Sequence, residues 1–264
     1  GIGRRLHRSV LATDLATEHL RKALEIVPEI GEQDVVAERI DRPDWRIFDC
    51  RFDLAATQRG EQSYAQAHLW QADILRYLGK FDEALQSLAI VYQLDPLSNF
   101  FKLNFAYQLI RFGDPVEGEK MLREVVAALP DDTNALAGLA FYPLMAIPQD
   151  ERAEFAERWA TAMGYSTPAR AGIIVEALVD AQKRPEALIV LQEIASECAW
   201  SNRYSRIAAM LGDRELTQSM LELGIQGGQV SVIGAGVEPL FAFIADDPQF
   251  KALVEQFNLP VIMP

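Results

Sequence analysis

The chain has 264 residues, of which 50% are hydrophobic, 24% charged and 9% aromatic, a balance typical of a globular protein with a sizeable core. Its 38 acidic and 25 basic side chains give a formal net charge of −13, which argues against direct binding to DNA or RNA, because a nucleic-acid binder needs a basic surface to displace counterions from phosphate. Two cysteines cannot form a disulfide framework, and three histidines leave little for a metal centre. No membrane span is expected, because prolines or glycines interrupt the longest uncharged stretches, 134–149 and 223–237.

The first predicted helices lie in residues 1–64, which form divergent copies of a helix-pair repeat that is clearest at 65–132. ATEHLRKALEIVP (residues 16–28) reads as the second helix of a pair whose first helix is largely missing. A divergent copy follows in 31–64, with a turn at Arg42-Pro43-Asp44 and a helix, WRIFDCRFDLAATQ, whose apolar residues are spaced near 3.6. Cys50 takes a position in this helix that a small residue fills in the next copy, which favours a buried structural thiol over a reactive or bridged one.

Two consecutive segments, 65–98 and 99–132, are each 34 residues long and repeat the same pattern. Each predicts a helix A and a helix B joined by a glycine and followed by a proline. Six pairs of identical residues recur at this offset: Ala72/Ala106, Leu75/Leu109, Gly79/Gly113, Leu88/Leu122, Val91/Val125 and Pro96/Pro130.

Several of these positions have a clear physical role. The alanine lies where helix A meets helix B, where a larger side chain would push the helices apart. The glycine ends helix A, since the residue after a helix often needs a positive φ, and the proline cannot continue helix B. Adding 68, twice the period, carries Leu20 onto Leu88 and Pro28 onto Pro96. This pattern is the signature of the tetratricopeptide repeat (TPR).

Beyond residue 132 the repeats diverge, but helices still follow in pairs over residues 133–223. The predicted pairs are 134–145 with 149–163, 168–182 with 185–198, and 201–211 with 214–223. Residues 224–264 then form a loop with one β-like run, Val230-Ser231-Val232-Ile233, and a C-terminal cap of two short helices, at 240–245 and 248–257. The sequence therefore predicts one all-α domain over 1–264, a right-handed TPR-like superhelix of about six helix pairs.

Residues that could support catalysis or cofactor binding are scattered. Gly-Ala-Gly at 234–236 lacks the third glycine and the βαβ context of a dinucleotide site, which favours a loop. His7, His19 and His68 fall on different faces or copies, so no metal and no cofactor is expected. Asp49 and Asp53 have arginines close by, which favours surface ion pairs over acid–base chemistry. Cys50 and Cys198 lie in different copies, so no bridge is expected, and the chain is predicted not to be an enzyme.

The helix A faces of a TPR array line a groove, and this groove is the candidate binding site. The groove positions of the two clean copies are Gln66, Leu69, Asp73, Arg76 and Tyr77, then Phe100, Leu103, Tyr107, Ile110 and Arg111. The second set is apolar and aromatic for a surface that faces water. Either Phe100 and Leu103 pack under a neighbouring helix, or they anchor an apolar segment of a partner. Leu69 and Asp73 replace the Lys and Asn that hold a C-terminal carboxylate in chaperone-binding TPR proteins, which disfavours that ligand.

Three stretches carry a further resemblance: GKFDEA (79–84) leading into YQLDPLSNF (92–100), the DWRIFDCRF helix, and the terminal DDPQFKALVEQFNLP. Together they resemble the C-terminal TPR regions of bacterial winged-helix transcriptional regulators of the CadC/ToxR-like type. The resemblance implies a sensor or interaction domain that binds a protein or peptide, or a second copy of itself. It implies a periplasmic location if the chain is attached to a membrane-spanning regulator, and a cytoplasmic one otherwise. The alternatives are a small-molecule sensor, with a pocket beside the 224–237 loop, and a free-standing TPR scaffold.

Overall fold

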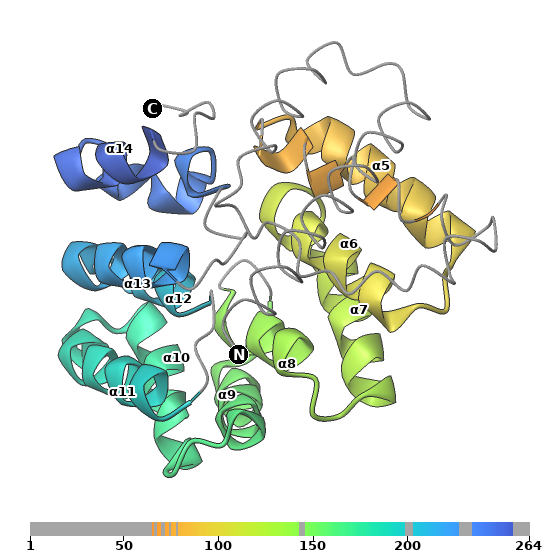
Figure 1. Cartoon of the computed structure of the whole chain (residues 1–264). Coiled ribbons are helices and arrows are strands. Elements are labelled where there is room, and N and C mark those ends of the chain that lie inside the picture. Colours follow the sequence, from red (N-terminus) through yellow and green to blue (C-terminus); the bar gives the residue numbers. More distant parts are fainter. Residues whose placement is uncertain are drawn as a thin grey trace, which may run out of the picture. The chain divides into compact units, whose positions relative to one another are not determined.

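The computed structural model describes residues 65, 68–69, 72–73, 75–77, 79–142, 146–198, 203–226 and 234–255, with the side chains of 225 and 226 left out. Within these ranges the chain is all-helical and contains no strand (Figure 1). In chain order the elements are α5 (Phe81–Leu94), α6 (Asn99–Phe112), α7 (Pro115–Ala128), α8 (Thr133–Phe141), α9 (Gln149–Met163), the 3-10 helix η1 (Pro168–Ala171), α10 (Gly172–Val179), η2 (Ala181–Lys183), α11 (Arg184–Glu197), α12 (Arg203–Met210), α13 (Arg214–Gln226), η4 (Pro239–Ile244) and α14 (Pro248–Glu255).

The chain divides into two compact units. Among the described residues, the first unit holds those up to Val91, those within Glu222–Pro239 and those from Ala245 onward. The second unit holds Tyr92–Leu221 and Leu240–Ile244. The predicted helices of residues 1–64 and the β-like run at 230–233 lie outside the described residues.

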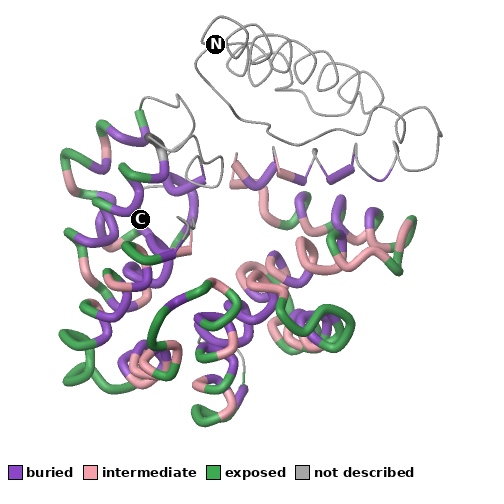
Figure 2. The backbone as a smooth tube through the Cα atoms, turned by 60° about the horizontal axis from the view of Figure 1, so that its bottom comes forward, coloured by how far each residue is buried: buried purple, intermediate pink, exposed green. Residues whose placement is uncertain are grey.

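Consecutive helices of the second unit pack in pairs, as the periodicity predicts. α6 packs on α7, α8 on α9, and α10 on α11. Each pair also contacts the next one, through α7 with α8, α9 with α10, and α11 with α12. In addition, α6 contacts α8 and α8 contacts α10, so that the first helices of neighbouring pairs touch one another directly. Buried and exposed positions alternate along most of these helices, which means that each turns one side inward (Figure 2).

Helix boundaries follow local capping signals. Asp114 caps α7 by accepting hydrogen bonds from the amides of Val116 and Glu117, and Pro115 occupies the first turn. Gly79 has φ of 75°, and the Gly79 and Lys80 amides donate to the carbonyls of Arg76 and Leu75, a Schellman ending. This confirms the predicted role of Gly79.

Gly113, which occupies the position of Gly79 in the second copy, behaves differently. Gly113 ends α6 with a φ of −136°, so it does not adopt the left-handed conformation that the sequence predicts. Only Gly113 and Asp114 separate α6 from α7, and the Asp114 cap forms the turn instead. A left-handed glycine does recur at Gly212, in the predicted turn between α12 and α13.

Two predicted helices are shorter than expected. The segment predicted as 134–145 ends at Phe141, because Tyr142 is extended and Pro143 follows it. The segment predicted as 168–182 consists of η1, α10 and η2, and α10 stops because Asp180 is extended and its carboxylate accepts from the Gln182 amide. Residues predicted as a regular helix at 240–245 form the 3-10 helix η4.

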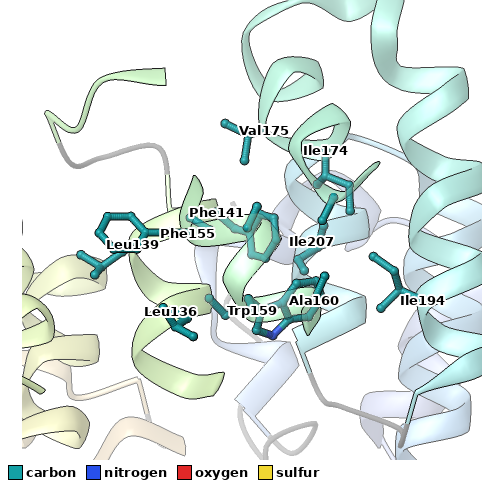
Figure 3. Close-up of a cluster of buried hydrophobic side chains, with 14 of the residues drawn as sticks. Leu136, Leu139, Phe141, Phe155, Trp159, Ala160, Ile174, Val175, Ile194 and Ile207 are labelled. Atoms are coloured by element: carbon teal, nitrogen blue, oxygen red, sulfur yellow. The ribbon is translucent and has the colours of Figure 1, made fainter. Parts of the chain in front are cut away.

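The core of the second unit is built around α8 and α9. Phe141 and Trp159 meet edge to face with ring centroids 5.0 Å apart, and Tyr204 of α12 lies edge-on to Trp159 at 6.3 Å. Ile174 of α10 is fully buried in the same cluster (Figure 3). Such a cluster fixes the helices because each buried aromatic ring removes a large apolar area from water.

Candidate interaction surfaces

The predicted groove residues of the first clean copy lie in the first unit. Gln66 is outside the described residues. Leu69 is 4% exposed, so it packs inside the unit, whereas Asp73 and Tyr77 are half-buried. Arg76 is 9% exposed. In this part of the chain, therefore, the cation of Arg76 and the ring of Tyr77 are largely shielded from solvent.

The Arg76 guanidinium is held by its neighbours on the same helix. Its Nη2 donates to the Asp73 carboxylate at 3.1 Å, and its Cζ lies 4.3 Å from the centroid of the Tyr77 ring. Burial opposes the charged form, but nearby groups, among them the Asp73 carboxylate that accepts its hydrogen bond and the Glu238 carboxylate, outweigh that cost and raise the pKa of Arg76 above its ordinary value. Arg76 therefore stays charged although it is buried.

A glycine from the far end of the chain covers this pair of side chains. A Cβ added to Gly234 would lie 3.2 Å from Arg76 Nη1 and 3.3 Å from Tyr77 Cδ1. Gly234 is thus in close contact with the guanidinium and the ring, within the first unit. Sequence periodicity could not reveal this contact, because the two segments are far apart in the chain.

The predicted groove residues of the second copy lie on α6, in the second unit. Exposure falls along this face from 57% at Phe100 to 1% at Ile110, with Leu103, Tyr107 and Arg111 half-buried. Phe100 is therefore open to solvent, while Leu103 packs against the core cluster. Ile110 lies against α7, where its Cγ1 would be 2.7 Å from a Cβ added to Gly118. A partner could reach the first half of this face directly, but Ile110 belongs to the contact between α6 and α7.

Tyr107 anchors the middle of the α6 face to α8. Its hydroxyl donates to the Asn134 carbonyl at 2.5 Å, and its ring meets Tyr142 edge to face at 5.6 Å. Burial raises the pKa of the Tyr107 hydroxyl, although the neighbouring Arg203 opposes this shift. Tyr107 is therefore a neutral hydrogen-bond donor with a fixed position.

Arg203 of α12 joins the same cluster. Its Cζ lies 5.8 Å from the Tyr107 ring centroid, Nη1 donates to the Thr133 carbonyl at 3.2 Å, and Nη2 donates to the Asn134 side-chain oxygen. These contacts join residues about seventy positions apart. The repeat pattern gave no sign of Arg203, Asn134 or Tyr142, because none of the three stands at one of its recurring positions.

The described residues contain no group of three or more His, Cys, Asp and Glu side chains that could hold a metal ion. None of the helices within those ranges is long and apolar enough to cross a membrane. Cys198 is buried and forms no disulfide, and burial raises the pKa of its thiol.

No protein-family profile matches this chain, and a comparison with curated proteins found no match either.

Proposed function

We propose that the chain is a non-catalytic protein-interaction or sensor module built from TPR-like helix pairs, the C-terminal part of a bacterial transcriptional regulator. The identical residues that recur at an offset of 34 support this proposal. The contacts of α6 with α8 and of α8 with α10 support it as well. In a stacked array of hairpins, neighbouring first helices line a common face while the second helices cover the other side.

The main support for the proposal is the contrast in solvent exposure along the α6 face. Phe100 projects an apolar ring, 57% exposed, from a helix whose next turns are fixed by Leu103 and Tyr107. An exposed aromatic residue on a rigid support is the arrangement found at interaction hot spots, because little conformational entropy is lost when a partner covers it. We expect a partner segment, or a second copy of the chain, to cover Phe100.

The test compares Phe100→Ala with Val116→Ala. Val116 is a matched control because it is also apolar, is 70% exposed, and lies in the first turn of α7 rather than on the α6 face. Each variant is used as bait, bound proteins are quantified by mass spectrometry, and self-association is measured by sedimentation. Phe100→Ala should lose a partner, or the self-association, that Val116→Ala keeps, with equal helicity by circular dichroism. If both variants behave like the wild type, the α6 face is not the binding surface.

A further inference from the structure

Arg152 of α9 is a buried cation that pairs with no carboxylate of the described residues. It is 6% exposed, its Nε donates to the Ala140 carbonyl at 2.9 Å, and its Nη2 is buried without a hydrogen-bond partner. Burial lowers the pKa of Arg152. The two preceding residues in the chain do not compensate its charge, because Glu151 is bound by Arg123 and Asp150 is exposed to solvent.

The repeat makes this arginine unexpected. Adding 34 to Ala84 gives Gly118, and adding 34 again gives Arg152. At Gly118 an added Cβ would lie 2.8 Å from the Ala106 carbonyl oxygen. Ala140 is the equivalent of Ala106 in the next copy, and its carbonyl accepts from Arg152. A guanidinium therefore takes a position between paired helices that holds a small residue in both clean copies, although burying an uncompensated charge there is costly.

The contact with α8 accounts for one part of the guanidinium. α8 ends at Phe141, so the Ala140 carbonyl lies in its last turn, at the negative end of the helix, where a cation is favoured. A guanidinium has five N–H donors, however, and those of Nη2 have no acceptor. Carboxylate and phosphate groups satisfy such donors best, because they accept charge-assisted hydrogen bonds and neutralise the cation as well.

The start of α9 supplies further donors next to Arg152. The helix is 15 residues long, and its N-cap residue, Pro148, forms no side-chain cap. The first amides of a helix have no partner within it and attract anions. Because helical side chains lean toward the N-terminus of their own helix, Arg152, at the fourth position, leans toward this first turn. Pro148, Gln149 and Asp150 are exposed, so a ligand can approach the turn from solvent.

We propose that the start of α9 is an oxyanion-binding site, in which the Arg152 guanidinium and the free amides of the first turn bind a carboxylate or phosphate group of a small ligand. This site lies on α9 and does not include the α6 face. It is therefore a second binding function of the chain, which does not depend on the partner proposed for Phe100.

The experiment titrates the full chain with sodium phosphate and, separately, with sodium acetate, at an ionic strength held constant with chloride. Proton–nitrogen NMR spectra follow the Nε–H signals of the arginines, and Arg152→Lys identifies the Arg152 signal by its loss. Arg158→Lys identifies the control signal. Arg158 is a matched control because it lies on the same helix, is half-buried, and also donates to a backbone carbonyl, that of Pro130.

We expect at least one of the two anions to shift the Arg152 signal to a plateau while the Arg158 signal stays in place. The anion that reaches the plateau at the lower concentration identifies the ligand as a phosphate or a carboxylate. In calorimetry, Arg152→Lys should bind that anion about tenfold more weakly than the wild type, because a lysine does not reproduce the guanidinium hydrogen bonds. Arg158→Lys should bind it like the wild type.

Three results would overturn the proposal. If neither anion moves the Arg152 signal, water satisfies Nη2. If the Arg152 and Arg158 signals drift together without a plateau, the response is a general effect of salt. Equal affinity of the wild type and Arg152→Lys would exclude the guanidinium as the binding group. The NMR titration uses the wild-type chain, so it decides the question even where Arg152→Lys folds poorly.

Discussion

Helices α6 and α7 approach each other closely at Gly118 of α7, and this approach makes a quantitative prediction. A Cβ added there would lie 2.8 Å from the Ala106 carbonyl oxygen, 3.1 Å from the Ile110 amide nitrogen and 2.7 Å from Ile110 Cγ1. Carbon atoms pack best at about 3.5–4.0 Å, and two of these three neighbours are backbone atoms that cannot rotate away. Gly118→Ala therefore forces α6 and α7 apart.

Two opposing effects set the size of the change. Replacing glycine by alanine inside a helix gains about 1 kcal/mol of helix propensity, whereas overpacking a close contact costs about 1–3 kcal/mol. Because the overlap is with backbone, we expect the upper part of that range and a net loss of about 1–2 kcal/mol in the free energy of unfolding.

Gly172→Ala is the matched control, because it has the same chemistry without the overlap. Gly172 begins α10 with helical dihedrals, and an added Cβ would meet only the Ala153 Cβ, at an ordinary 3.5 Å. This substitution should be neutral or stabilise by up to about 1 kcal/mol. Urea unfolding followed by circular dichroism measures both variants. If Gly118→Ala is as stable as Gly172→Ala, the two helices do not approach as closely as the structure indicates.

Three further substitutions test individual contacts by the same unfolding assay. Tyr107→Phe removes the hydroxyl that donates to a carbonyl of α8 and should lower the free energy of unfolding by about 1–2 kcal/mol. Tyr92→Phe, at a half-buried ring on α5, is the control and should change it little. Equal losses in the two variants would mean that the Tyr107 hydroxyl contributes nothing. Gly79→Ala should cost about 1–2 kcal/mol, because the residue has φ of 75°, and an unchanged stability would argue against the left-handed ending. Hydrogen bonds from Arg123 lower the pKa of Glu151, so the pair stabilises the fold at neutral pH and loses that effect as the pH falls through the lowered pKa. Because both groups are partly exposed, Glu151→Gln should cost less than about 1 kcal/mol at pH 7, and this cost should disappear as the pH falls through the lowered pKa of Glu151. A difference between the variant and the wild type that persists in acid would exclude this ion pair as its cause.

The sequence predicted much of the helical framework of the described residues because its signals are local. The spacing of apolar residues indicated where helices lie, and Gly79 and Gly212 marked where two of them end. The repeated alanine was correctly predicted to be buried, with Ala72 and Ala106 at 3% and 0% exposure. Each of these features depends on neighbours a few positions away, so the chain alone specifies it.

The candidate surfaces were predictable only in part. Periodicity placed Phe100 and Tyr107 on one face of α6, and the structure leaves Phe100 exposed while Leu103 packs against the core. The periodicity gave no sign that Ile110 turns toward Gly118, since a groove position and a position between paired helices differ by a small rotation about the helix axis.

What the sequence by itself determined is the class of structure: helices, their approximate ends and their pairing. Only the tertiary structure decided which polar groups meet. Arg203 contacts the start of α8, which lies about seventy residues earlier in the sequence. Gly234 contacts Arg76, from which it is separated by a much longer stretch of chain. Helix formation depends on interactions over one or two turns, whereas such contacts exist only after the packed helices have fixed the position of every segment within its unit.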